Sequence, residues 1–283
     1  KTVCIGYGSG GGVMTADADG TIAIGYEAGA GVTSGIGNVA IGMSALVSED
    51  TGDYNTAIGY QALSTQNVDG TVGNTAVGYN AGAALTTSVG NVAIGYNALL
   101  ANTSGGLNIA IGYGAMDETG HGDCPTSAAN VFIGLDSGGG TWSTNDSNYN
   151  VAVGNGTMDA AMNGAEDNTA VGHNAMSGLT TGDNNTVLGA WAGNDIAAGT
   201  ANTCIGQGAG DLIANADNNT CIGQDAGNVL TAGGNNTILG AGADTSANDS
   251  ANQTAIGYGA TGQADNSVTL GNADVTAVYA AQD

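Results

Sequence analysis

The chain has 283 residues, of which 52 are glycine, one is proline and one is phenylalanine, and its formal net charge is −24. So much glycine argues against helices, whereas 42% apolar residues are too many for a solvated disordered linker. Lys1 is the only basic residue, so the chain has almost nothing with which to neutralise phosphates. This argues against nucleic-acid binding and against anionic membrane surfaces, and the composition predicts a turn-rich, all-β repeat.

A glycine follows a short apolar run sixteen times along the chain, and nine of the fifteen intervals are 17 residues long. Such a period predicts a parallel β-solenoid, in which each coil buries its apolar face against its neighbours. We expect about sixteen coils, each with two short strands and two turns. The glycines are Gly6, Gly25, Gly42, Gly59, Gly78, Gly95, Gly112, Gly134, Gly154, Gly172, Gly189, Gly206, Gly223, Gly240, Gly257 and Gly271.

The residue before each of these glycines is Ile, Val or Leu, and the residue three before it is Val, Ile or Thr. Strand side chains alternate, so these two positions share one face. Since β-branched residues suit a buried pleated surface, we expect both positions to line the interior. Representatives of the first position are Ile58, Ile94, Ile205 and Ile222.

Two further positions of the repeat have a predicted structural role. Four residues before the glycine stands Asn in twelve coils, where a side-chain amide can bond the next coil at a corner. Three residues after the glycine stands Ala in twelve coils, such as Ala62, where we expect the second strand. The predicted asparagine ladder includes Asn38, Asn55, Asn91, Asn185 and Asn236.

The residue two before the glycine is small and apolar in most coils. It is mainly Ala, and three coils have a cysteine there: Cys4, Cys204 and Cys221. On our assignment this column faces outward, so both strand faces are apolar and a second copy of the chain is expected to cover it. The alternative is a thin exposed alanine stripe on a monomer. We expect Cys204 and Cys221, which stand one coil apart in this column, to be free stacked thiols.

The motif Asn55–Leu63, NTAIGYQAL, resembles repeats of bacteriophage tail fibres and of trimeric autotransporter adhesin heads. The resemblance covers nearly the whole chain and implies a left-handed parallel β-roll assembled as a parallel homotrimer. Two features depart from it: the family's head repeat is often 14 residues long, and no membrane anchor or coiled-coil stalk is seen in these residues.

We expect a shaft over residues 1–271 and an exit segment over 272–283 that leads to a following domain. The chain opens in the middle of a repeat, so we expect it to be a piece of something longer.

The regular spacing is interrupted once, between Gly112 and Gly154, where the two longest intervals are adjacent. Insertions in solenoids map to loops on one face, often the binding face, and aromatic side chains there suit contact with carbohydrate or protein. We therefore predict a receptor-binding site with His121, Trp142 and Tyr149. The alternative is a tolerated surface insertion.

No set of residues has the arrangement of a catalytic site, and we predict that the chain is not an enzyme and has no cofactor. Asp17-Ala18-Asp19-Gly20 is a fragment of a calcium loop, but the closing Glu is missing. Calcium is therefore only a secondary expectation. Tyrosine follows the glycine in four successive coils, from Tyr60 to Tyr113, which predicts a ladder that stacks on itself rather than on sugars.

Our first functional hypothesis is the structural and adhesive shaft of a viral tail fibre, extracellular, without membrane insertion, which attaches to a host-surface glycan or protein. The alternative is the head of a bacterial surface adhesin. An ice-binding solenoid ranks lower because we expect the threonine column to face inward and because the coil lengths vary. A self-assembling extracellular fibril is a fourth hypothesis.

Overall fold

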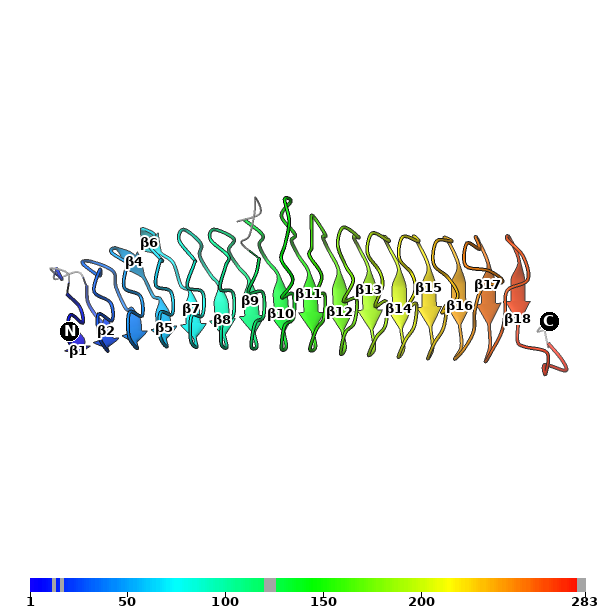
Figure 1. The fold of residues 1–283 in the computed structure, drawn as a ribbon, viewed down its shortest axis with the longest axis horizontal. Helices are drawn as coiled ribbons and strands as arrows, with labels where there is room; N and C mark the ends of the chain where they lie inside the picture. Colours follow the sequence, from blue (N-terminus) through cyan, green and yellow to red (C-terminus); the bar gives the residue numbers. More distant parts are fainter. Residues whose placement is uncertain (12–13, 16–17, 120–125, 279–283) are drawn as a thin grey trace, which may run out of the picture. The chain divides into compact units, whose positions relative to one another are not determined.

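A computed structural model describes residues 1–283 except 12–13, 16–17, 120–125 and 279–283. The described residues contain β-strands, turns and loops and no helix, and nearly every coil has one strand of three residues (Figure 1). These strands are β1 (Val3–Ile5), β2 (Ile22–Ile24), β3 (Val39–Ile41), β5 (Thr56–Ile58), β7 (Thr75–Val77), β8 (Val92–Ile94), β9 (Ile109–Ile111), β10 (Val131–Ile133), β11 (Val151–Val153), β12 (Thr169–Val171), β13 (Thr186–Leu188), β14 (Thr203–Ile205), β15 (Thr220–Ile222), β16 (Thr237–Leu239), β17 (Thr254–Ile256) and β18 (Val268–Leu270).

The chain divides into two compact units, one of residues 1–156 and 160–164 and one of residues 157–159 and 165–283. In the first unit β1, β2, β3, β5, β7, β8, β9, β10 and β11 pair in parallel in that order, and in the second unit β12 to β18 do the same. Equivalent residues of the repeat face one another, as in Ala40 opposite Ala57 and Cys204 opposite Cys221. The predicted parallel β-solenoid, of about sixteen turns with about 17 residues per turn, is confirmed.

The prediction of a second strand in each coil was wrong. After the strand glycine the chain turns, because two alternate residues take left-handed backbone angles, as do Gln61 (φ 53°) and Leu63 (φ 50°) on either side of Ala62. Such residues wind the chain instead of extending it. In the described residues the remaining strands are β4 (Gly52–Asp53) and β6 (Gly70–Thr71), which pair with each other.

The assignment of the inner face was also wrong. In the three-residue strands from β2 to β17 the middle residue is the buried one, so Ala57 and Cys204 lie in the core, whereas Ile58 is 36% exposed and Ile94 is 37% exposed. Ile205 and Ile222 are half-buried on the same outer face. Because side chains alternate along a strand, the small middle column points inward and the larger aliphatic columns point outward.

In several coils the residue six positions after the middle one fills the space left by a small strand residue. Where both are small, as in Ala23 with Gly29 and Ala76 with Gly82, the buried side chains of Val32 and Leu85 lie beside the glycine. Ala93 is followed by the buried Leu99, whereas Phe132 is followed by Gly138. A Cβ atom on Gly138 would lie 2.5 Å from the Phe132 ring. Small and large side chains therefore compensate in volume within a coil, as close packing requires.

The strand glycines stack on one another from coil to coil. Gly95 has φ of +139°, and a Cβ atom there would lie 2.2 Å from the carbonyl oxygen of Gly112. Only glycine fits that conformation and that approach, which explains why this position is glycine in every coil.

Candidate functional sites

The asparagine ladder is present as predicted and is a buried hydrogen-bond network. The Nδ2 atom of Asn202 donates to the Ala216 carbonyl (2.7 Å), and its Oδ1 atom accepts from the backbone N–H of Asn219 (3.0 Å). Its own backbone N–H donates to Oδ1 of Asn185 at 2.9 Å. The Asn202 amide thus satisfies backbone groups of its own coil and of the next one. The predicted members Asn38, Asn55, Asn91, Asn185 and Asn236 are buried and take part in it.

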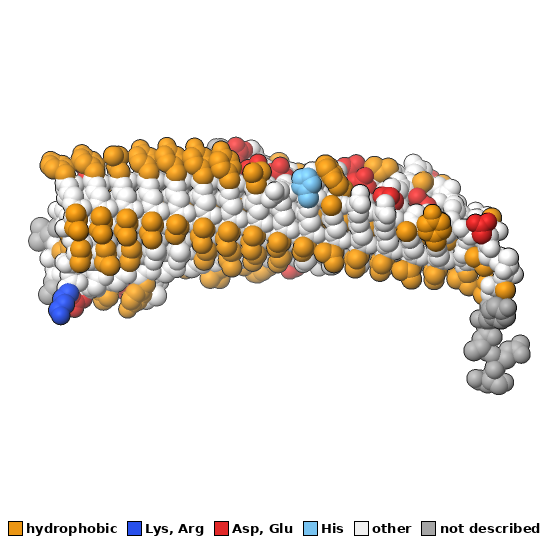
Figure 2. Space-filling view, turned by 90° about the horizontal axis from the view of Figure 1, so that it is seen from below, with side chains coloured by type: hydrophobic (Ala, Val, Ile, Leu, Met, Phe, Trp, Pro, Cys, Tyr) orange, Lys and Arg blue, Asp and Glu red, His pale blue; other side chains and the backbone are white. Residues whose placement is uncertain are grey.

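The outer face of the strands is an uncharged surface of aliphatic and threonine side chains. We call it the outer face and define it as the first and third residues of the three-residue strands. In β1 to β11 its first column is mainly Val, Ile and Thr, and in β12 to β17 it is Thr throughout. The third column is Ile, Val or Leu in both units, and Figure 2 shows hydrophobic side chains aligned in rows over successive coils. The threonines of the second unit are Thr169, Thr186, Thr203, Thr220, Thr237 and Thr254, all at least partly exposed.

The three residues predicted to bind a receptor do not form a site among the described residues. His121 lies outside the described residues. Trp142 is 1% exposed, and its ring meets that of Phe132 edge-on with centroids 5.7 Å apart, so it is a core side chain. The insertion brings this Trp into the interior because the apolar ring finds space beside Phe132. Tyr149 is 60% exposed and stays a predicted contact residue.

The tyrosine ladder of Tyr60, Tyr79, Tyr96 and Tyr113 stacks on itself. Adjacent ring centroids are 5.0, 5.0 and 4.9 Å apart, and the rings are within 10° of parallel. The inner rings of the stack have both faces covered by neighbours and expose only edges and hydroxyl groups. The prediction that this column packs on itself is confirmed.

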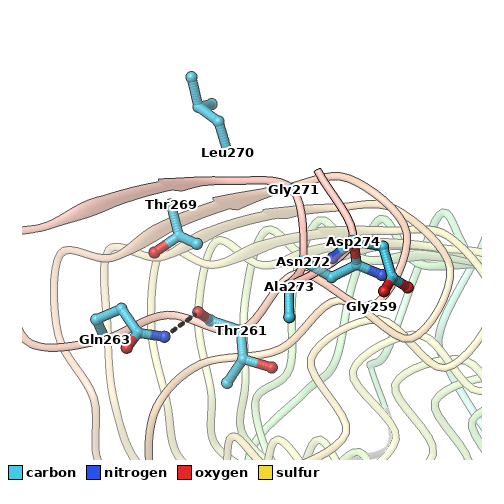
Figure 3. Close-up of a pocket in the computed structure, with 9 residues that line it drawn as sticks. All are labelled: Gly259, Thr261, Gln263, Thr269, Leu270, Gly271, Asn272, Ala273 and Asp274. Atoms are coloured by element: carbon cyan, nitrogen blue, oxygen red, sulfur yellow. Dashed lines mark hydrogen bonds between the residues drawn. The ribbon is translucent and has the colours of Figure 1, made fainter. Parts of the chain in front are cut away.

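A cavity of about 660 Å³ lies at the last coil, where the chain leaves β18 (Figure 3). Its lining offers hydroxyl and amide groups, with Asp274 as its one charged side chain, and Gln263 donates to the carbonyl of Thr261 at 2.9 Å. Such groups suit hydrogen bonding to a polar segment. The lining residues are Gly259, Thr261, Gln263, Thr269, Leu270, Gly271, Asn272, Ala273 and Asp274.

Glu49 is a carboxyl group inside a coil. Its Oε1 accepts from the backbone N–H groups of Asp50 (3.0 Å) and Gly52 (2.8 Å), and Oε2 is 3.5 Å from the N–H of Val68. Burial raises the pKa of Glu49 above its ordinary value, and the backbone donors offset only part of that effect. From its place in a loop the sequence predicts Glu49 to be a solvated surface carboxylate, and that prediction is wrong, since the side chain is buried. Its counterparts one coil away on either side, Val32 and Gln66, are uncharged.

Cys204 and Cys221 are buried free thiols on paired strands, as expected, and Cys4 is an exposed free thiol. The neighbouring Cys204 thiol and burial raise the pKa of Cys221 far above that of an ordinary thiol. Cys221 is therefore a protonated core side chain. Cys124 lies outside the described residues.

Within the described ranges no three or more His, Cys, Asp or Glu side chains gather in a group that could hold a metal ion. The same part of the chain forms no helix with the length and apolar character that crossing a bilayer needs. Comparison of the chain with protein-family models, curated proteins and solved structures gave no match in any of the three.

Proposed function

We propose that this chain is a structural and adhesive shaft, built as a parallel homotrimer, in an extracellular fibre that attaches a virus to its host. The alternative within the same class is the head of a bacterial surface adhesin. The role we propose is not catalytic. The observation that supports it best is the outer face, where the strands of each unit leave aliphatic side chains exposed over successive coils.

A second copy of the same chain is the occupant that fits this face. In a parallel, in-register assembly each coil meets the equivalent coil of its neighbour, so Ile58 would meet Ile58 and Leu188 would meet Leu188. The outer-face positions carry no charged residue, so three copies could approach there without burying like charges, despite a net charge of −24 on each. An exposed apolar strip of this length otherwise invites non-specific association.

The test is the mass of the particle in solution by light scattering. We expect a trimer for the native chain and a smaller particle for Ile58→Asp, because that change places carboxylates together at the interface. Ser48→Asp, at an exposed turn position of the same unit, is the matched control and should leave the trimer intact. A monomeric native chain, or an Ile58→Asp variant that stays trimeric, would contradict the proposal.

The threonines of β12 to β17 favour a second candidate function, ice binding. One of the two reasons for ranking it low was that threonine would face inward, and that reason is wrong because these side chains are on the outer face. Stacked coils space them about 4.8 Å apart in a regular row. The native chain should then widen the gap between the melting and freezing temperatures of ice. The double variant Thr203→Leu with Thr220→Leu should leave that gap closed. A native chain without that gap would remove this candidate.

A further inference from the structure

A second cavity, of about 300 Å³, lies in the column of residues that follow the strand glycines, which is tyrosine in seven coils and alanine at position 241. We call it the notch; its lining is Gln224, Asp225, Ala241, Gly242, Tyr258 and Gly259, all within the second unit. Gln224, Ala241 and Tyr258 follow the strand glycines of three successive coils. The middle coil thus contributes only a methyl group where its neighbours contribute long side chains.

The missing side chain leaves space for one flat ring. In the tyrosine ladder adjacent rings are 4.9 to 5.0 Å apart, so a Tyr at position 241 would stack on Tyr258. With Ala241 there, Tyr258 is 78% exposed, and a Cβ atom added to Gly242 would meet no atom within 4 Å. Among the described residues no aromatic ring stacks on Tyr258, so its face is open toward the notch.

The opposite wall of the notch is polar. Gln224 donates to a carboxylate oxygen of Asp225 at 3.2 Å, and both side chains line the cavity. Asp225 offers only acceptors, and the Gln224 amide offers both donors and a carbonyl acceptor. A ligand for this site therefore needs an apolar ring face on one side and several hydroxyl donors at its edge.

We propose that the notch is a binding site for one pyranose unit of a neutral or amino sugar, which stacks on Tyr258 and donates hydroxyl groups to Asp225 and Gln224. The sugar ring takes the place that a tyrosine ring takes in the ladder. The Asp225 carboxylate and the net charge of −24 repel sialylated, uronic-acid and phosphorylated sugars. The cavity is at the small end of the range for ligand sites, which fits a single residue of a larger glycan. This inference rests on the proposed attachment role and names its ligand class.

The experiment is binding of the whole chain to immobilised glycans that end in a neutral hexose, an N-acetylhexosamine or glucosamine, with sialylated and glucuronic-acid glycans beside them. We expect binding only in the neutral and amino-sugar set. Tyr258→Ala should weaken it at least tenfold because the stacking face is lost. Ala241→Tyr should abolish it, because that variant restores a ladder residue that other coils accept and fills the notch without disturbing the fold.

Tyr96→Ala is the matched control, since it removes a ladder ring whose faces are covered, and it should bind as the native chain does. Absence of binding to every neutral glycan, undiminished binding by Ala241→Tyr, or a preference for sialylated glycans would overturn the assignment. The mass of the same preparations separates this result from the trimer proposal. A trimer that binds no sugar would contradict only the proposed sugar site in the notch. A monomer that binds sugar would contradict only the proposed trimer.

Discussion

At the scale of single residues, the coils are held in register by buried amides. Asn202 connects its own coil to the coils before and after it through bonds of 2.7 to 3.1 Å. Its position in the sequence was predictable because an amide recurs at the same place in the repeat. The carbonyl that accepts from the amide, Ala216, lies three residues before the next ladder residue, Asn219, and the same offset recurs in other coils, as in Asn185 with Gly199. The residue type at the accepting position varies, so the sequence does not mark it, and the structure is needed to identify it.

We expect Asn202→Ala to lower the free energy of unfolding, because it leaves the Asn219 N–H and the Ala216 carbonyl unpaired in the core. Each buried group left without a partner costs on the order of 1–3 kcal/mol. Asn248, which is exposed, supplies the control: Asn248→Ala should change little. Urea unfolding of both variants measures this, and equal midpoints would show that the ladder contributes no net stability.

Glu49 gives a pH-dependent prediction. Its pKa is raised in the folded state, so the stability that it contributes is fully present below the unfolded value of about 4.3 and declines as the pH rises through the folded value. Glu49→Gln keeps an acceptor but no charge. The variant should therefore have a higher thermal midpoint than the native chain at pH 7, and the difference should shrink toward pH 4. A difference that stays constant with pH would mean that Glu49 does not titrate in this range.

At the scale of the coil, the repeat predicted the fold but not which face lies inside. Both faces of the strand are apolar, so alternation alone could not choose between the Ala57 column and the Ile58 column. The Ile58 column was assigned to the interior because large branched side chains are usually found in a core, and that assignment was wrong. The signal that could have decided it was the pairing of the middle strand residue with the residue six positions later: Ala110 goes with Met116, whereas Phe132 goes with Gly138. Residues that compensate in volume must share one interior.

That pairing predicts strong coupling within the coil of β10. Phe132→Ala alone should cost about 3–5 kcal/mol through the cavity that it leaves, and Gly138→Met alone should overpack the core against the ring. The double variant reproduces the Ala–Met pair of the coils on either side and should recover much of the loss. A double-mutant cycle by urea unfolding measures the coupling, and additive costs would show that the two positions do not share space.

The insertion between Gly112 and Gly154 shows a second limit of sequence reasoning. A lone Trp in a long loop has the composition of a binding site, yet Trp142 enters the core beside Phe132. Burying a large ring offsets the entropy of ordering a longer loop. The notch, in contrast, could have been found in the sequence, because Ala241 interrupts a column between Gln224 and Tyr258. That the notch has room for one flat ring could be inferred only from the ring spacing of the tyrosine ladder, which the structure gives.

At the scale of the whole molecule, the charge balance should govern stability. The chain carries 25 acidic residues against one lysine, and the one ion pair among the described residues joins the N-terminal amine to Asp19. Repulsion among carboxylates is thus almost uncompensated, and folding brings them closer together. A salt shortens the range of that repulsion, from a Debye length of about 30 Å at 0.01 M to about 10 Å at 0.1 M.

We therefore expect the thermal midpoint to rise by several degrees when NaCl is raised from 0.01 to 0.3 M, and KCl should act equally at the same ionic strength. CaCl₂ at matched ionic strength separates screening from binding: an equal rise means that calcium acts as a screening ion, and a larger rise means that carboxylates bind it. A midpoint that does not change with NaCl would mean that the acidic side chains are too far apart to repel one another. In that case their number would bear on solubility and on the choice of ligand in the notch, and not on the stability of the coils.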